Sequence, residues 1–152
     1  MTQTRRFEDV KVGEELPPLD VATTTALIVG GALASRDFTP VHHDKAAAQA
    51  QGLPDVFMNI LTTNGFVGRY ISDWAGPDAL LRGIKTKLGG PNLPGDTLTI
   101  RAKVQETKDG IVAIQVTGNN SWGNHVSSTV RVELPRKGRV RGPRSEAQPS
   151  GG

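Results

Sequence analysis

The hydrophobic period of this chain changes once, and that change restricts the folds that the chain can adopt. Between residues 56 and 74 the apolar residues recur at the spacing of one helix face: Phe57, Ile60, Leu61, Val67, Ile71 and Trp74. From residue 97 onward the period becomes two, with apolar and polar residues alternating through 97–104, 112–116 and 126–134. The sequence therefore predicts one long helix followed by half-buried antiparallel strands.

Further strands are predicted on both sides of the long helix. Residues 84–88 favour one strand, and the extended stretch after Pro17-Pro18 favours another at the beginning of the chain. Asp109-Gly110 and Gly123-Asn124 are turn signals between the later strands. We expect a meander of four strands after the long helix, preceded by the N-terminal strand.

Two short helices are expected before the long one. The first covers about residues 26–35, with Thr23 or Thr24 as its N-cap, and the second covers 45–50, with Asp44 as its N-cap. With no internal repeat, these elements predict a single α+β domain in which a curved antiparallel β-sheet wraps around a long central helix. The domain is expected to span 1–135.

The remaining residues, 136–152, are predicted to form a disordered basic tail. This segment is rich in Gly, Pro, Ser and Arg, and it contains five Lys or Arg residues against one Glu. Because the whole chain carries a formal charge of only +3, the body is close to neutral. The basic character therefore belongs to the tail, and we expect no nucleic-acid partner.

Composition also limits the compartment and the chemistry. The chain has no cysteine, which excludes disulfides, a thiolate nucleophile and a zinc–thiolate site. The first 15 residues lack the apolar stretch of a secretory signal. The longest apolar run, 26–34, is far shorter than the roughly 18–20 residues of a membrane-spanning helix. We therefore expect a soluble, cytoplasmic protein without a membrane partner.

The chain has three histidines, and two of them share one loop, 37–44. Pro40 keeps Thr39 out of the helical conformation and shapes a turn, so Asp37 and His42 can converge although they lie five residues apart. A carboxylate beside an imidazole is suited to activating water, because the imidazole transfers protons near neutral pH. By spacing alone, a turn-capping carboxylate and a packed loop histidine remain the alternative.

The other polar candidates are His43, Asp44, His125 and Asn64. His43 and Asp44 do not predict a metal site, because adjacent histidines point in different directions and no third ligand has suitable spacing. His125, at the start of a strand beside a turn, is expected at the surface. Asn64 lies on the apolar stripe of the long helix, where its amide either finds a buried partner or lines a substrate pocket.

The loop sequence Arg36-Asp37-Phe38-Thr39-Pro40-Val41-His42-His43-Asp44 resembles the signature of MaoC-like (R)-type enoyl-CoA hydratases, members of the hotdog superfamily. Its usual form is Asp-x-Asn-Pro-aliphatic-His-x-Asp. The resemblance covers about residues 7–135, including the opening Phe-Glu-Asp-Val-Lys-Val-Gly and Gly-Asp-Thr-Leu at 95–98. Segments 34–38, 41–44, 59–62 and 73–77 resemble more closely the small subunit of actinobacterial heteromeric hydratases that act on steroid side-chain CoA thioesters.

This chain departs from the general signature at three places. Arg36 stands where the family has glycine, and Thr39 stands where it has asparagine. Met58-Asn59 replaces the family's His-Gly at the start of the central helix, where the glycine amide helps to bind the thioester oxygen. A backbone amide survives a side-chain change, so Asn59 keeps a donor, but its bulk alters the geometry of the oxyanion site.

The resemblance implies a single hotdog fold and a hydration reaction. Asp37 and His42 are its catalytic residues, and they hold the water that adds to the β-carbon of an enoyl-CoA, with both transfers on one face. The resemblance implies Asn59 as the oxyanion donor, and Asn64 on the helix stripe is the candidate substrate-binding residue. No metal and no cofactor is expected, because the substrate itself carries coenzyme A.

The resemblance also implies an assembly. The expected partner is a second, larger MaoC-like subunit in a heterodimer or heterotetramer, because pairing closes a sheet edge and the acyl tunnel; a homodimer is the alternative. Two other functions remain open, namely a hotdog acyl-CoA thioesterase and a non-catalytic scaffold subunit of a MaoC-like complex.

Overall fold

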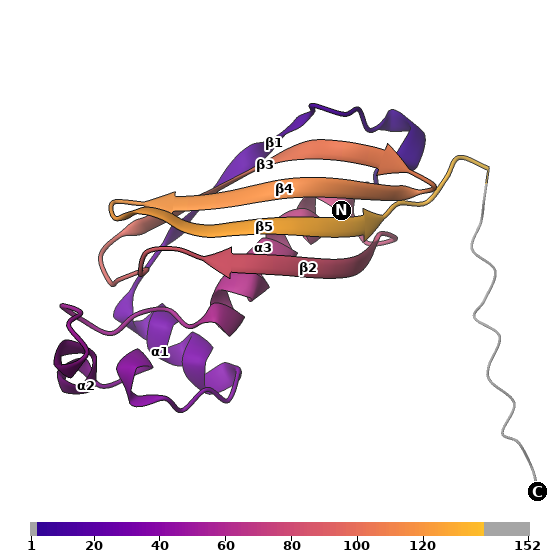
Figure 1. The fold of residues 1–152 in the computed structure, drawn as a ribbon. Coiled ribbons are helices and arrows are strands. Elements are labelled where there is room, and N and C mark those ends of the chain that lie inside the picture. The colour runs from indigo at the N-terminus through magenta and orange to yellow at the C-terminus, as the bar shows by residue number, and fades with distance from the viewer. Residues whose placement is uncertain (1–2, 139–152) are drawn as a thin grey trace, which may run out of the picture.

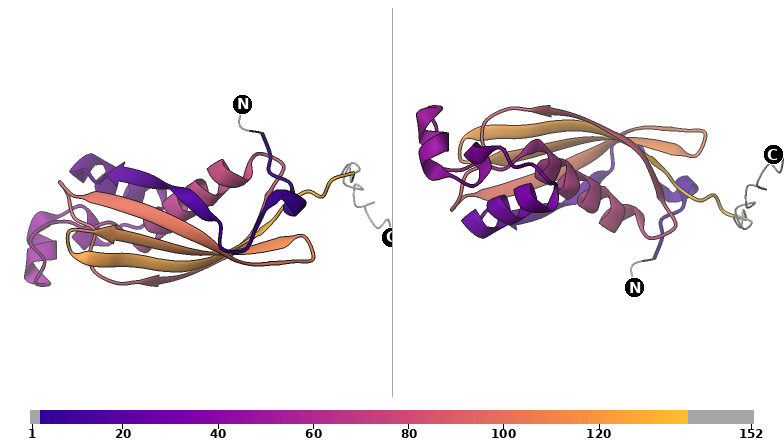
Figure 2. Two further views of the ribbon diagram at one scale, coloured as in Figure 1. Left: turned by 90° about the horizontal axis from the view of Figure 1, so that it is seen from above. Right: turned by 90° about the horizontal axis from the view of Figure 1, so that it is seen from below.

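The computed structural model describes residues 3–138, and its centre is a five-stranded antiparallel sheet. The strands are β1 (Glu15–Ala22), β2 (Leu80–Leu88), β3 (Thr97–Lys108), β4 (Ile111–Asn120) and β5 (Gly123–Glu133). Helix α3 (Ile60–Ala75) lies along one face of the curved sheet. Helix α1 (Thr25–Ala34) lies beside α3 near one end of the sheet, and α2 (Lys45–Ala50) lies farther out at the same end (Figures 1 and 2). The predicted α+β fold, with a curved sheet around a long helix, is confirmed.

The core lies between α3 and the sheet. Alternate residues of the three long strands are buried against the helix, as their period of two predicts: Leu98, Ile100, Val104, Val112, Ile114, Val116, Val126, Val130 and Val132. The helix contributes Val67 and Ile71, both with no exposed surface. Because burying one such side chain contributes about 1.5–3 kcal/mol, this layer fixes α3 against the sheet.

The order of the strands differs from the predicted meander. The sheet runs β1-β3-β4-β5-β2, so β2 pairs with β5 and only β3, β4 and β5 follow one another. The connection between Leu88 and Thr97 is longer than a tight hairpin turn, which allows β2 to pair on the far side of β5. The predicted position of β2 is therefore wrong, although its existence is confirmed.

The central helix begins later than its apolar pattern indicates. Residues 56–59 are not helical, and α3 starts at Ile60 because the side chain of Asn59 accepts a hydrogen bond from the Thr62 N–H and caps the helix. Val56 and Met58 are nevertheless buried, so the apolar pattern extends past the helix start.

The short helices are capped as predicted. Thr24 caps α1 by accepting from the Leu27 N–H, and Asp44 caps α2 by accepting from two N–H groups of its first turn. No helix among residues 3–138 is long and apolar enough to cross a membrane.

One of the two predicted turns is displaced. Asp109 and Gly110 both have positive φ, as a two-residue hairpin turn requires. The second turn lies at Ser121-Trp122, two residues before the predicted Gly123-Asn124. This displacement places His125 inside β5, where it is 2% exposed, so the prediction of a surface histidine is wrong.

Two residues just after the predicted domain end at 135 contact the N-terminal segment. The Arg136 guanidinium carbon lies over the Phe7 ring, 5.2 Å from its centroid, and Lys137 Nζ is 2.6 Å from Asp9 Oδ1. Residues 139–152, which make up most of the predicted tail, lie outside the described residues.

Candidate active site

The C-terminus of α1 delivers the acidic residue of the site. The Asp37 N–H donates to the Ala32 carbonyl and the Arg36 N–H donates to the Leu33 carbonyl, the pair of bonds that closes a Schellman motif. Such an ending requires a left-handed residue, and Arg36 adopts it with φ 58°. The backbone therefore turns sharply at the end of α1 and presents Asp37 immediately after the turn.

The carboxylate of Asp37 is held by the turn that follows it. Its Oδ1 accepts from Thr39 Oγ1 at 2.7 Å and from the Thr39 N–H at 3.2 Å, which forms an Asx-type turn. Pro40 then begins a short 3-10 helix, Pro40–His42, which returns the chain toward Asp37. The proline-shaped turn thus brings the two predicted residues together.

His42 faces Asp37 with one ring nitrogen and is anchored by the other. His42 Nδ1 lies 2.6 Å from the Phe57 carbonyl oxygen, and His42 Nε2 lies 3.4 Å from Asp37 Oδ2. Because a carbonyl oxygen only accepts, Nδ1 carries the proton, and in the neutral imidazole Nε2 is the free base. The ring also meets Phe57 edge-to-face, with centroids 4.8 Å apart.

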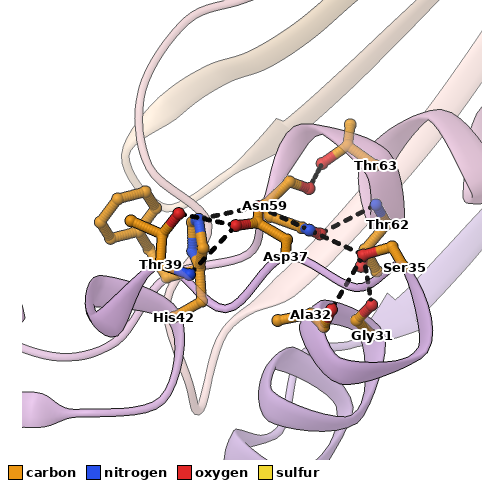
Figure 3. A network of polar contacts seen from close by, with 10 residues as sticks. Gly31, Ala32, Ser35, Asp37, Thr39, His42, Asn59, Thr62 and Thr63 are labelled. Carbon is orange, nitrogen blue, oxygen red and sulfur yellow. Dashed lines mark hydrogen bonds and ion pairs between the residues drawn. The ribbon is translucent and has the colours of Figure 1, made fainter.

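Asn59 connects the two halves of the site. Its Nδ2 donates to Asp37 Oδ2 at 3.0 Å and to Ser35 Oγ at 2.9 Å, while its Oδ1 caps α3. Figure 3 shows this network, with Asn59 between Asp37 and the first turn of α3. One buried amide therefore fixes the carboxylate, the end of α1 and the start of α3 relative to one another.

These donors keep the carboxylate of Asp37 ionised. The Thr39 hydroxyl contributes most, followed by the Asn59 amide and the Thr39 N–H, and together they lower the pKa of Asp37 from its ordinary 3.8 to about 2. The side chain is 20% exposed and that of His42 is 9% exposed. Asp37 is therefore an acceptor of hydrogen bonds at any physiological pH.

Both groups open onto one cavity of about 410 Å³. Asp37, His42, Asn59 and His125 are its polar lining residues. The remaining lining is apolar or glycine: Leu53, Phe57, Met58, Ile60, Leu88, Gly89, Gly90 and Pro91. A mostly apolar cavity with a few convergent polar groups is typical of a small-molecule site.

The start of α3 supplies backbone donors beside the carboxylate. Asn59 and Ile60 line the cavity, and within residues 3–138 the N–H of Asn59 has no acceptor. The first N–H groups of any helix lack intrahelical partners, and the helix dipole makes this end favourable for negative charge. The cavity thus combines a base, a carboxylate and the amino end of a long helix.

Residues 9–132 match the family model for the MaoC like domain. The chain belongs to the MaoC-like domain family. A relative from Mycobacterium tuberculosis, named 3-oxo-4,17-pregnadiene-20-carboxyl-CoA hydratase beta subunit, is 46% identical over 123 residues, which cover 81% of this chain and 95% of that protein.

Solved structures give the same fold. A chain of the ChsH1-ChsH2 complex from Mycobacterium tuberculosis matches with a TM-score of 0.80 and 45% identity, over 82% of this chain and 98% of that one. The R-hydratase PhaJ1 from Pseudomonas aeruginosa matches with a TM-score of 0.79 at 18% identity, over 93% and 96% of the two chains. The predicted hotdog fold of this MaoC-like chain is therefore confirmed.

The structure brings three of the four predicted site residues of this MaoC-like domain together. Asp37, His42 and Asn59 share the cavity, whereas Asn64 is not among its lining residues. The buried Oδ1 of Asn64 has no hydrogen-bond partner within residues 3–138, so the expected buried partner is missing for this atom. A substrate contact for Asn64 stays a prediction. His43 is exposed and does not line the cavity.

Sequence reasoning missed several residues of the site. The sequence marks Thr39 only as a departure from the family signature, not as the main donor to Asp37, and it does not predict the side chain of Asn59 as a cap and an anchor. An asparagine just before a helical stripe is a cap signal, so the capping role of Asn59 could be predicted from the sequence. His125 carried no such signal, because a displaced turn determines its burial.

Proposed function

We propose that this chain is the water-adding subunit of an enoyl-CoA hydratase. One observation carries the proposal: Asp37 Oδ2 and a proton-accepting His42 Nε2 lie 3.4 Å apart at the wall of one largely apolar cavity. A single water molecule can donate one hydrogen to Asp37 Oδ2 and the other to His42 Nε2. Both bonds together direct a lone pair of the water oxygen toward the cavity. This arrangement suits addition of water to an activated double bond.

The chemistry divides between the two residues. His42 Nε2 accepts a proton from the water as the water oxygen bonds to the β-carbon of the enoyl thioester. The electron pair of the double bond moves to the thioester as an enolate, and the α-carbon then takes a proton from the imidazolium, which restores the neutral ring. Asp37, held ionised, orients the water and stabilises the imidazolium. The net change is the addition of one water.

Negative charge develops on the thioester oxygen during this reaction. We assign its stabilisation to the amino end of α3, where the Asn59 N–H has no acceptor within residues 3–138. Fixed donors at a developing oxyanion are among the largest catalytic effects in enzymes. The side chain of Asn59 points its amide at Asp37 and caps the helix, so only its backbone is assigned to the oxyanion.

The substrate and the partner are proposed from the relatives. The relative named as a hydratase beta subunit supports a steroid side-chain CoA thioester as substrate, and that name together with the ChsH1-ChsH2 complex supports a partner subunit. We propose a second, larger MaoC-like subunit as this partner. Coenzyme A enters as part of the substrate, and no further cofactor is assigned a role. We place the reaction in the cytoplasm.

The test measures hydration and thioester cleavage in one assay. The chain is co-expressed with candidate partner subunits encoded near it, and the purified complex is incubated with short and steroid-sized enoyl-CoAs. We expect the hydroxyacyl-CoA as product. Free CoA without hydroxyacyl-CoA would instead identify a thioesterase, and activity confined to the partner alone would identify a scaffold.

Variants assign the reaction to this site. Asp37→Asn and His42→Gln are expected to lower kcat by about 10²–10⁴-fold, the usual contribution of general acid–base catalysis. His43→Gln is the matched control, because His43 is the adjacent histidine, is exposed and does not line the cavity. Near-normal turnover in either site variant, with the complex intact, contradicts the proposed function.

A further inference from the structure

A β-bulge aims a third histidine at the same cavity. In the pairing of β4 with β5, Gly118 faces Val126 and Asn119 faces Asn124, so His125 is the extra residue on β5. A bulge of this kind redirects a side chain that strict alternation would send to the other face. As a result His125 and its neighbour Val126 are both buried, and His125 lines the cavity with Asp37 and His42.

Both ring nitrogens of His125 are engaged. Nδ1 lies 2.8 Å from the Gly90 carbonyl oxygen, and Nε2 lies 2.9 Å from Thr63 Oγ1. The carbonyl only accepts, so Nδ1 carries the proton. Burial lowers the pKa of His125, which keeps the ring neutral and leaves Nε2 as an acceptor for the Thr63 hydroxyl.

These two bonds join elements that lie on different sides of the cavity. Thr63 belongs to the first turn of α3, where its N–H donates to the Asn59 carbonyl. Gly90 belongs to the segment after β2 that lines the cavity together with Pro91. The imidazole of His125 therefore sets the spacing between the amino end of α3 and this segment.

The segment is also fixed to β5 through the backbone. The Gly89 N–H donates to the His125 carbonyl at 2.8 Å, and the Gly90 N–H donates to the Asn124 carbonyl at 2.9 Å. A Cβ on Gly89 would overlap the Asn124 carbonyl oxygen, so the two backbones approach more closely than a side chain allows. Gly89 and Gly90 are thus held rigidly against β5, and the bond between Thr63 and His125 determines how far the first turn of α3 lies from them.

We propose that His125 is a positioning residue for hydration: with Thr63 it holds the first turn of α3 at the distance from Gly89-Gly90 at which the Asn59 N–H meets the thioester oxygen. The inference rests on the proposed hydratase function. It predicts that loss of the bond between Thr63 and His125 affects the chemical step more than substrate binding, because apolar contacts elsewhere in the cavity remain.

The test compares five variants of the full chain in the complex. Thr63→Val removes the hydroxyl with little change of shape, and His125→Asn keeps a donor for Gly90 but loses the contact with Thr63. We expect each to lower kcat by about tenfold or more, as small displacements of catalytic donors do, with KM changed by less than about threefold. Thr63→Ser restores the hydroxyl and is expected to restore kcat.

Thr86→Val is the matched control. It also removes one hydroxyl bond, a partly buried one of 2.8 Å between Thr86 and Ser128, but neither residue lines the cavity. We expect it to leave kcat unchanged even if it lowers the melting temperature. Thr63→Val also removes the 3.3 Å contact of the Thr63 hydroxyl with the Asn59 carbonyl oxygen. The double variant Thr63→Val, His125→Asn is expected to be no slower than the slower single variant, because both substitutions remove the bond between Thr63 and His125.

The outcomes separate the two proposals. If Asp37→Asn and His42→Gln abolish hydration but Thr63→Val keeps wild-type kcat, His125 does not position the oxyanion donor and this inference is overturned. A rise in KM alone, or independent losses in the double variant, also overturns it. If Asp37→Asn and His42→Gln leave hydration intact, the proposed function itself fails, whatever Thr63→Val does.

Discussion

The side chain of Asn59 has two separable duties, and substitutions can remove them one at a time. Asn59→Ala removes the cap of α3 and, with the amide, the bonds to Asp37 and to Ser35. Asn59→Asp keeps a carboxylate oxygen for the cap, and aspartate is as good an N-cap as asparagine. It replaces the amide donor, however, with a second negative charge about 3 Å from Asp37 Oδ2, as the position of Nδ2 indicates.

The expected magnitudes follow from these contacts. Loss of an N-cap costs about 0.5–2 kcal/mol, so Asn59→Ala, which also removes the amide bonds to Asp37 and Ser35, is expected to lower the free energy of unfolding by at least about 1 kcal/mol. Both variants are expected to lower kcat by at least about tenfold, because Asp37 loses the donor that fixes Oδ2. In Asn59→Asp the two carboxylates share a proton, so the hydration rate acquires a titration well above the pKa of about 2 found for Asp37 alone.

Two assays separate the duties. Urea unfolding followed by circular dichroism measures the free energy of unfolding, which reports loss of the α3 cap. The pH dependence of enoyl-CoA hydration reports the ionisation of Asp37. The reasoning is refuted if Asn59→Asp hydrates at the wild-type rate with an unchanged pH profile. It is also refuted if the loss of kcat in Asn59→Ala disappears once the fraction of folded protein is taken into account.

Three further predictions concern the neighbourhood of the site. Arg36→Gly is expected to raise the free energy of unfolding by about 0.5–1 kcal/mol in urea titrations, because glycine adopts φ 58° without the cost that a side chain incurs. Gly31→Ala is expected to lower the free energy of unfolding by about 1–2 kcal/mol, because the new Cβ would overlap Thr62 Oγ1 and lie 2.8 Å from Thr62 Cγ2. This steric cost exceeds the gain from the better helix propensity of alanine. Thr39→Val is expected to raise the pKa of Asp37, because the Thr39 hydroxyl is the main cause of its depression. The pKa of Asp37 in the fold lies below its ordinary 3.8, so the stability that the ionised carboxylate contributes is present above about pH 4 and is lost as the pH falls toward 2. Carbon NMR titration of the Asp37 carboxyl group should show a higher midpoint in Thr39→Val than in the wild type. An unmoved midpoint counts against the Thr39 hydroxyl as the main cause.

Local patterns predicted the elements well, because each depends on its own residues. Strand alternation gave the buried faces of β3, β4 and β5, and Thr24 and Asp44 were identified as caps. The start of α3 was misplaced because Val56 and Met58 are buried without being helical. Apolar spacing reports burial, and only the cap at Asn59 shows where the helix begins.

The site was predictable in part for the same reason. Asp37 and His42 lie in one short loop, so a proline-shaped turn was enough to bring them together. His125 approaches from a strand 83 positions after His42 in the chain, through a bulge in β5. Long-range pairing determines that bulge, and no local pattern of the sequence encodes it.

The most direct test of the account is a crystal structure of the complex with a saturated acyl-CoA, which occupies the cavity but cannot be hydrated. We predict one ordered water within about 3 Å of both Asp37 Oδ2 and His42 Nε2. That water should also lie about 3–3.5 Å from the β-carbon of the bound thioester. A thioester bound with its β-carbon away from these two residues, or a water held by neither, would contradict the hydration mechanism.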